Sequence, residues 1–351
     1  MANAFAQEKP QLRDFGSSLK KDSKKKVESQ TVKPTGGGDD IVRVETDLVT
    51  SDVMVVDDKG KAILGLDQRD FIVTEDGRPQ EIAMFSLGDA QAIPRSIVLI
   101  IDYSSSQLPY IKTSIDAAKT LVDKLGPKDT MAVVTDDVEL LVDFTRDKSL
   151  LKDSLESLRN RALSKRVGKS LQYDALLATL REMFTAEDIR PIIIVQTDGD
   201  QIEFLRRFSY KDVERAVEKS RATIYTIIPN SLIGLREKER LPRVAEARSA
   251  YTHDTLSIDL LRAWIKRMLT WHVSIAQLAK LSGGWPDSLD KPEQADEVYE
   301  RIFADINNRY LIGYYPTNKT RDGKKRNVTI EMRGHSEYIV WGRKSYLAPS
   351  Q

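Results

Sequence analysis

The sequence predicts an α/β fold, a doubly wound and mostly parallel sheet inserted into or flanked by a small β-sandwich. The continuous apolar runs Ser96–Ile101 and Ile192–Val195 are typical of strands that a parallel sheet buries on both faces. Amphipathic helical segments alternate with these runs, as they do in doubly wound sheets. Segments with a period of two, typical of half-buried strands, lie on both sides of the α/β part.

The composition excludes several classes of protein. With 351 residues, of which 40% are hydrophobic and 30% charged, the chain has room for about two domains and is neither a collagen nor a wholly disordered polymer. Its net charge of +1 argues against a dedicated nucleic-acid binder. It has no cysteine, which excludes disulfides, thiol nucleophiles and thiolate metal sites. With only 3 histidines, any metal would have to be held by oxygen ligands. No run of about 18 apolar residues predicts a transmembrane segment.

Residues 1–40 are expected to form a disordered lead-in. This segment is rich in lysine, ends in Pro34–Gly38 and has few regularly spaced apolar residues. Ala4-Phe5-Ala6 has the small-x-small form of a signal-peptidase site, although no apolar stretch precedes it. The segment therefore has two interpretations, an ordinary polar N-terminus or the remnant of a signal peptide. The second predicts an exported protein of the periplasm, the cell envelope or the extracellular space.

Two β-rich segments are expected to share one sandwich. Across residues 41–93, alternating residues and the turn signals Asp57–Gly60 and Asp76-Gly77 indicate short strands. Residues 309–351 return to β structure. Neither segment is long enough to bury a core alone, so we expect them to be the first and second parts of a single β-sandwich.

The α/β part is expected over residues 94–308. Residues 229–272 interrupt its alternation with charged, mainly helical sequence and are expected to form a helical insert. The insert carries several cations beside Trp264 and Trp271. A flap docked on its own domain, with a solvated basic face, is favoured over a patch that binds a partner or a membrane surface.

Polar side chains follow two of the predicted buried strands. Asp102, Ser104 and Ser106 form a D-x-S-x-S pattern directly after the first strand, and Asp198 follows the strand Ile192–Val195. Ser170 lies between them, just before a predicted helix. In doubly wound folds, ligands bind outside the carboxyl ends of the strands. The sequence therefore predicts that these five side chains converge from three loops.

This set of side chains has the chemistry of a hard-cation site. Mg²⁺ takes oxygen ligands, keeps several waters and needs only one or two carboxylates. Two carboxylates roughly balance its charge, so the ion can still attract an Asp or Glu carboxylate of a partner protein. We therefore expect Mg²⁺, with Mn²⁺ and Ca²⁺ as alternatives. The pattern is also compatible with a plain helix N-terminus, because Ser and Asp cap helices, but its place between a buried strand and a helix favours the metal.

These residues resemble the metal-ion-dependent adhesion site (MIDAS) of the von Willebrand factor A (vWA) domain. Asp102, Ser104 and Ser106 match its first loop, and Asp198 lies in a matching Thr-Asp-Gly. The family usually has a threonine in the middle loop, where this chain has Ser170; a serine keeps the hydroxyl but lacks the methyl group that stiffens threonine. The resemblance covers about residues 94–308 and implies a vWA fold with these five residues as metal ligands.

A narrower resemblance extends over most of the chain. Asp70–Gly77 and Tyr310–Pro316 are similar to segments of vWA-related proteins abundant in Acidobacteria, which are typically exported. This resemblance implies an envelope location and a vWA domain set in β structure, and it says little about the ligand.

Three functional hypotheses follow. The favoured one is a non-enzymatic, metal-dependent adhesion or protein-binding module of the cell envelope. The second is a metal-dependent hydrolase or phosphotransferase that uses the same ligands; against it, no general base has a convincing spacing and no Gly-rich phosphate loop follows a strand. The third is a structural scaffold with a vestigial site. No nucleic-acid partner is expected, and the oligomeric state is left open.

Two other polar features are given structural roles. His253 and His272 lie in or beside the insert, in no recognised metal spacing. Asp136-Asp137 follow the second strand of the α/β part and are expected to form a turn, with an auxiliary cation site as the alternative.

Overall fold

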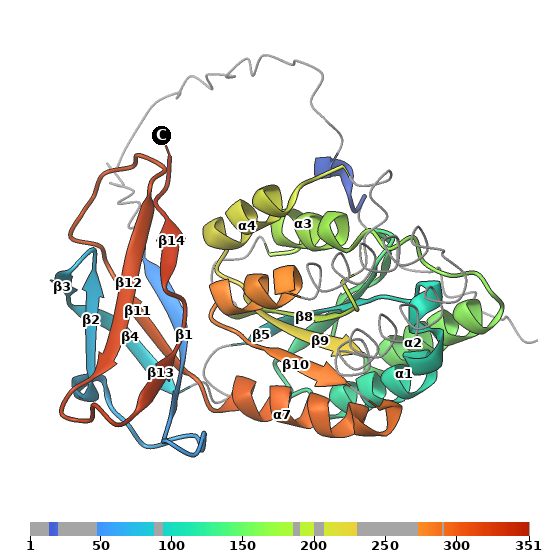
Figure 1. Ribbon diagram of the computed structural model, residues 1–351, viewed down its shortest axis with the longest axis horizontal. Coiled ribbons are helices and arrows are strands. Elements are labelled where there is room, and N and C mark those ends of the chain that lie inside the picture. Colours follow the sequence, from blue (N-terminus) through green and yellow to red (C-terminus); the bar gives the residue numbers. More distant parts are fainter. Residues whose placement is uncertain are drawn as a thin grey trace, which may run out of the picture.

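The computed structural model shows a β-sandwich beside an α/β domain (Figure 1). It describes residues 14–19, 48–87, 94–184, 190–199, 207–229, 273–289 and 291–350. The expected helical insert, with His253 and His272, and the Ala4-Phe5-Ala6 motif lie outside these residues. Within them, no helix is both long enough and apolar enough to cross a membrane.

The α/β domain is built on one six-stranded sheet. Its strands are β5 (Arg95–Ile101), β6 (Thr130–Thr135), β7 (Leu140–Thr145), β8 (Arg190–Gln196), β9 (Thr223–Pro229) and β10 (Pro286–Leu289). They lie in the order β10-β9-β8-β5-β6-β7, and only the pair β6–β7 is antiparallel. The order reverses at β5, which lies between β6 and β8. Such a switch point is where doubly wound folds bind ligands.

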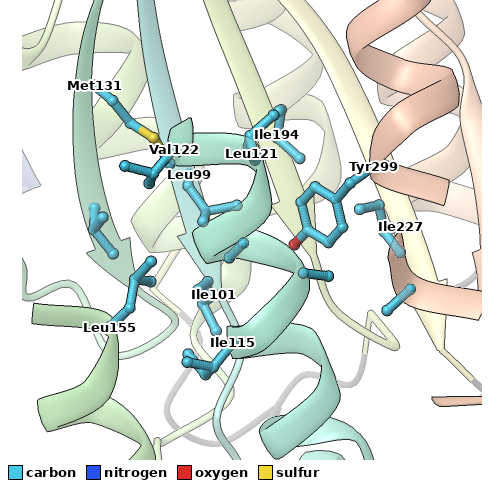
Figure 2. Packing of buried hydrophobic residues seen from close by; sticks show 14 of the residues in the cluster. Leu99, Ile101, Ile115, Leu121, Val122, Met131, Leu155, Ile194, Ile227 and Tyr299 are labelled. Atoms are coloured by element: carbon cyan, nitrogen blue, oxygen red, sulfur yellow. The ribbon is translucent and has the colours of Figure 1, made fainter. Parts of the chain in front are cut away.

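Helices cover both faces of this sheet (Figure 1). They are α1 (Leu108–Asp123), α2 (Lys148–Leu163), α3 (Gln172–Glu182), α4 (Tyr210–Lys219) and α7 (Ala295–Asn307), and residues 273–281 are also helical. On β5, Leu99 and Ile101 pack toward α1, α2 and α7, whereas Val98 and Ile100 pack toward α3 and α4. Figure 2 shows the first of these two cores. Because both faces are covered, every residue of β5 and β8 is buried, as the apolar runs predicted.

The sandwich takes strands from both sides of the α/β domain. These are β1 (Val49–Val56), β2 (Phe71–Glu75), β3 (Arg78–Gln80), β4 (Ile82–Leu87), β11 (Tyr310–Tyr314), β12 (Lys325–Met332), β13 (Ile339–Trp341) and β14 (Ser345–Leu347). They form the sheets β13-β1-β11-β4 and β14-β12-β2-β3. The core between them contains Val53, Phe71 and Ile312. The fold class predicted from the sequence is therefore confirmed.

A buried ion pair holds the sandwich to the α/β domain. Nε of Arg190 on β8 donates to both carboxylate oxygens of Asp52 on β1, at 2.8 and 2.9 Å. These side chains are only 4% and 7% exposed. The hydroxyl of Thr223 donates to the same carboxylate at 3.1 Å. At the other junction, Arg95 at the start of β5 hydrogen-bonds Asn307 at the end of α7, so the two ends of the α/β domain lie together.

Residues 14–19 differ from the expectation for the lead-in. Residues Ser17–Leu19 form a short 3-10 helix, η1, and Leu19 is buried against Leu177 and Ala178 of α3. The N–H groups of Gly16 and Ser18 both donate to the carboxylate of Glu182, each at 2.8 Å. A disordered segment was the wrong prediction here, because the order comes from contacts with α3 rather than from any period in the segment.

Candidate metal centre

Three loops meet at the carboxyl ends of β5, β6 and β8. Asp102 directly follows β5, and its N–H donates to the carbonyl oxygen of Gln196, the last residue of β8, at 3.0 Å. Asp136 directly follows β6, and its N–H donates to the carbonyl oxygen of Ile101 at 3.1 Å. The parallel strands thus bring both aspartates to the same edge of the sheet, at the switch point.

Asp102 is completely buried, and both of its carboxylate oxygens accept hydrogen bonds. Oδ1 accepts from the N–H of Ser104 at 2.9 Å. Oδ2 accepts from the side-chain amide of Gln172 at 2.6 Å and from the hydroxyl of Thr197 at 2.7 Å. Burial, followed by repulsion from Asp198, raises the pKa of Asp102 to about 6, and the Ser104 and Thr197 bonds oppose this rise. Within the described residues, no basic side chain is among the main influences on this pKa.

The hydroxyls of the first loop lie beside this carboxylate. Ser104 and Ser106 place their Oγ atoms 3.1 Å apart; Ser104 is buried and Ser106 is exposed. Ser104 precedes the 3-10 helix η3 (Ser105–Gln107) but makes no side-chain capping bond to it. The capping role that could explain a D-x-S-x-S pattern is therefore not the role of Ser104. Its hydroxyl is directed to Ser106 instead.

Ser170 reaches the site through Asp136. Its N–H donates to Oδ2 of Asp136 at 2.7 Å, and its φ of 53° lies in the left-handed region. Within the described part of the chain, its hydroxyl makes no hydrogen bond to the other four candidate ligands. Asp136 is itself buried, and burial, together with repulsion from Asp102, raises the pKa of its carboxyl well above the usual value.

The structure brings the five predicted residues to one edge of the sheet, to different degrees. Asp102, Ser104 and Ser106 share a loop, and the half-buried Asp198 lies near enough for its charge to act on Asp102. Ser170 joins them only indirectly. Among the described residues, no three His, Cys, Asp or Glu side chains gather as metal ligands. A cation at this edge would therefore depend on hydroxyl oxygens as well as carboxylates.

Three further residues have roles in the site that the sequence did not predict. Thr197 and Gln172 orient Asp102, and Asp136 holds Ser170. For Thr197 the signal was its place beside Asp198 at the end of a strand. Asp136 follows β6 as Asp102 follows β5, and that shared position could have indicated it. Gln172 gave no signal, because its role depends on the docking of α3.

Comparison with known proteins gives likenesses of fold. No protein-family model matches the sequence, and no curated protein sequence matches it. A von Willebrand factor type A structure from Catenulispora acidiphila is 11% identical over 88% of this chain and 75% of its own, with a TM-score of 0.44. The doubly wound sheet, with loops from β5 and β8 at its switch point, decides the architecture. The α/β domain has a doubly wound α/β fold, as the sequence predicted.

Two other structures show the same kind of likeness. BatB from Bacteroides thetaiotaomicron is 16% identical over 61% of this chain and 98% of its own, with a TM-score of 0.40. Proximal thread matrix protein 1 of the mussel byssus, whose MIDAS motif is occupied by zinc, is 15% identical over 66% of this chain and 49% of its own, with a TM-score of 0.43. With identities of 16% or less and TM-scores below 0.5, these likenesses carry no conclusion about this chain. The resemblance to proteins of Acidobacteria stays a prediction.

Proposed function

We propose that the protein is a metal-dependent binding module of the cell envelope. In this proposal, Asp102, Ser104, Ser106, Ser170 and Asp198 hold a Mg²⁺ ion. The ion keeps an open coordination position for an Asp or Glu carboxylate of a partner protein. The observation that supports this most is the buried carboxylate of Asp102, which faces a second carboxylate and no basic side chain of the described residues.

A buried negative charge of this kind is typical of a cation ligand. A carboxylate that is buried without a cationic partner costs free energy, and proteins retain such charges where they coordinate a metal. A pKa of about 6, against an ordinary 3.8, corresponds to about 3 kcal/mol disfavouring the ionised form. A divalent cation would remove this cost. The hydroxyls of Ser104 and Ser106, which lie together and do not cap a helix, are ligands of the type that Mg²⁺ accepts.

The surrounding residues would fix the direction of the ligands. Gln172 and Thr197 both donate to Oδ2 of Asp102, and the N–H of Gly199 donates to the Thr197 hydroxyl at 2.9 Å. Hydrogen bonds of this kind orient metal ligands and contribute to affinity. When bound, the cation would supply electrostatic attraction for a partner carboxylate. Nothing in this arrangement requires the protein to catalyse a reaction, and we propose a non-enzymatic role.

Calorimetric titration with Mg²⁺ and Mn²⁺ tests the metal site. We expect wild type to bind one ion and Asp102→Ala to bind none, with Zn²⁺ as a further arm of the titration. Asp153→Ala is the matched control, because Asp153 is an exposed aspartate on α2 of the same domain. Absence of metal-binding heat in wild type would overturn the proposal.

Two further measurements test the rest of the proposed function. Metal-dependent turnover of a phosphoester by the loaded protein would favour a hydrolase or phosphotransferase over a binding module. A partner that is captured equally well in Mg²⁺ and in EDTA would contradict a carboxylate bound through the ion. Export is part of the proposal, and fractionation of the producing cell tests it: recovery from the cytoplasm alone would remove that part.

A further inference from the structure

We infer that Asp136 is a positioning residue of this site: its carboxylate clamps the loop of Ser104 and Ser106 to the loop of Ser170. The inference rests on the proposed function, because the loops that it joins carry the proposed ligands. It gives a role to a residue for which the sequence favoured a turn, with an auxiliary cation site as the alternative.

The contacts of Asp136 are made to the backbone of both loops. Oδ1 accepts from the N–H of Tyr103 at 3.2 Å, and Oδ2 accepts from the N–H of Ser170 at 2.7 Å. Its main chain adds two bonds: its N–H donates to Ile101, and its carbonyl oxygen accepts from Leu171 at 2.9 Å. One fully buried residue thus fixes the position directly before Ser104 and the position of Ser170 itself.

Gly168 makes room for this carboxylate. A Cβ at residue 168 would lie 2.1 Å from Oδ1 and 2.4 Å from Oδ2 of Asp136, which is far inside van der Waals contact. The carboxylate therefore lies directly against the glycine, a close approach that no other residue allows. The N–H of Gly168 in turn donates to the carbonyl oxygen of Tyr103 at 3.2 Å. Tyr103 is consequently held on both sides, by Asp136 and by Gly168.

The backbone of Ser170 needs such a restraint. A non-glycine residue with a φ of 53° is uncommon and strained, and it persists only where the surroundings hold it. The bond from Ser170 N–H to Asp136 and the bond from Leu171 N–H to the same residue supply that restraint. Without them, Ser170 would relax and the middle loop would lose its place beside the first loop.

Asp136 acts through these loops rather than by touching the ion. Both of its oxygens are engaged by backbone N–H groups, and Gly168 covers them. Loss of the clamp should therefore weaken metal binding without abolishing it, because the other ligands remain. Residues that orient metal ligands typically contribute roughly 10- to 100-fold in affinity.

The test compares Asp136→Asn with Asp137→Asn. An asparagine keeps the shape but must turn its NH₂ group toward one of the two N–H donors, so one arm of the clamp is lost. Asp137 is the matched control, because it accepts from the side-chain hydroxyls of Tyr103 and Thr135 and from neither loop backbone. Two readouts are used: Mn²⁺ affinity, and hydrogen exchange of the Tyr103 and Ser170 amides in the metal-free protein.

We expect Asp136→Asn to lower Mn²⁺ affinity by roughly 10- to 100-fold and to speed exchange at both amides. Asp137→Asn should change neither. When made alone, Gly168→Ala should change Mn²⁺ affinity and amide exchange as Asp136→Asn does. In an Asp136→Ala background it should have little further effect, because the carboxylate that the new methyl group would contact is absent. Non-additivity of this kind would not arise from general loss of stability.

Two results would overturn the inference. Unchanged amide exchange in Asp136→Asn would show that no clamp exists. Faster exchange with unchanged Mn²⁺ affinity would show that the clamp positions nothing. Failure of wild type to bind Mn²⁺ is a separate result: it removes the proposed function and the positioning role with it, while the exchange data still decide whether the clamp is real.

Discussion

Lowering the pH from 7.5 to 5.5 should weaken Mn²⁺ binding about fourfold. The pKa of Asp102 in the metal-free protein is raised to about 6, so protons compete with the cation below that pH. The ionised fraction falls from about 97% at pH 7.5 to about 24% at pH 5.5, and affinity falls in proportion. An aspartate with an unshifted pKa would stay ionised at both values.

Titration calorimetry at the two pH values measures this effect, and Asp198→Asn identifies its cause. Removing the Asp198 charge should lower the pKa of Asp102, so the variant should bind more weakly overall yet depend less on pH. At pH 6, wild type should release about half a proton per ion bound, which titrations in buffers of different ionisation enthalpy reveal. Equal affinity at both pH values would refute the reasoning, as would an undiminished pH dependence in Asp198→Asn.

The remaining predictions concern stability. Asp102→Asn should stabilise the metal-free protein at pH 7.5 by up to about 3 kcal/mol. The pKa of Asp102 is higher in the folded protein than in the unfolded chain, so ionisation of Asp102 opposes folding at this pH. Calorimetric melting checks this, and an unchanged melting temperature would contradict it. Asp52→Ala leaves the buried Arg190 guanidinium without its carboxylate and should cost about 3–5 kcal/mol in denaturant unfolding. Thr223→Val, which removes one bond to Asp52, should cost only about 1 kcal/mol. Leu19→Ala should speed proteolysis near η1 with little change in global unfolding, and equal cleavage rates would count against docking of this segment.

The parts of the fold that the sequence predicted are those with a period or a buried run of their own. The strands β5 and β8 are buried throughout, and their apolar runs Ile97–Ile101 and Ile192–Val195 fit the covering of both faces. The Asp76-Gly77 hairpin has the positive φ angles that this pair of residues favours. Strand β10 was not predicted. It contains a proline and an aspartate, and it is a strand only because it pairs with β9 at the edge of the sheet.

The candidate site also has a part that a local sequence pattern indicated and a part that depends on packing. Asp102, Ser104 and Ser106 are close in sequence, so their spacing, together with their place between a buried strand and a helix, indicated a site. The partners that orient them come from α3 and from the ends of β6 and β8, and their distances depend on how these elements pack. Asp136 illustrates the limit, because a turn-forming Asp-Asp pair and a clamp between two loops have the same sequence.

The division of the sandwich between the two ends of the chain has a consequence for biosynthesis. Strand β4 ends at Leu87, whereas β11, which pairs with it, begins at Tyr310. At roughly 5–20 residues per second, the ribosome adds the roughly 220 residues between them in about 10–45 s. During this interval β2 can pair with β3, but β1 and β4 lack their partner β11, and the α/β domain can fold. When the α/β domain is folded, the start of β5 lies beside the end of α7, and this places β11 next to the first strands of the sandwich. The yield of this protein should therefore depend on how well those first strands are kept from aggregating during synthesis, as well as on its final stability.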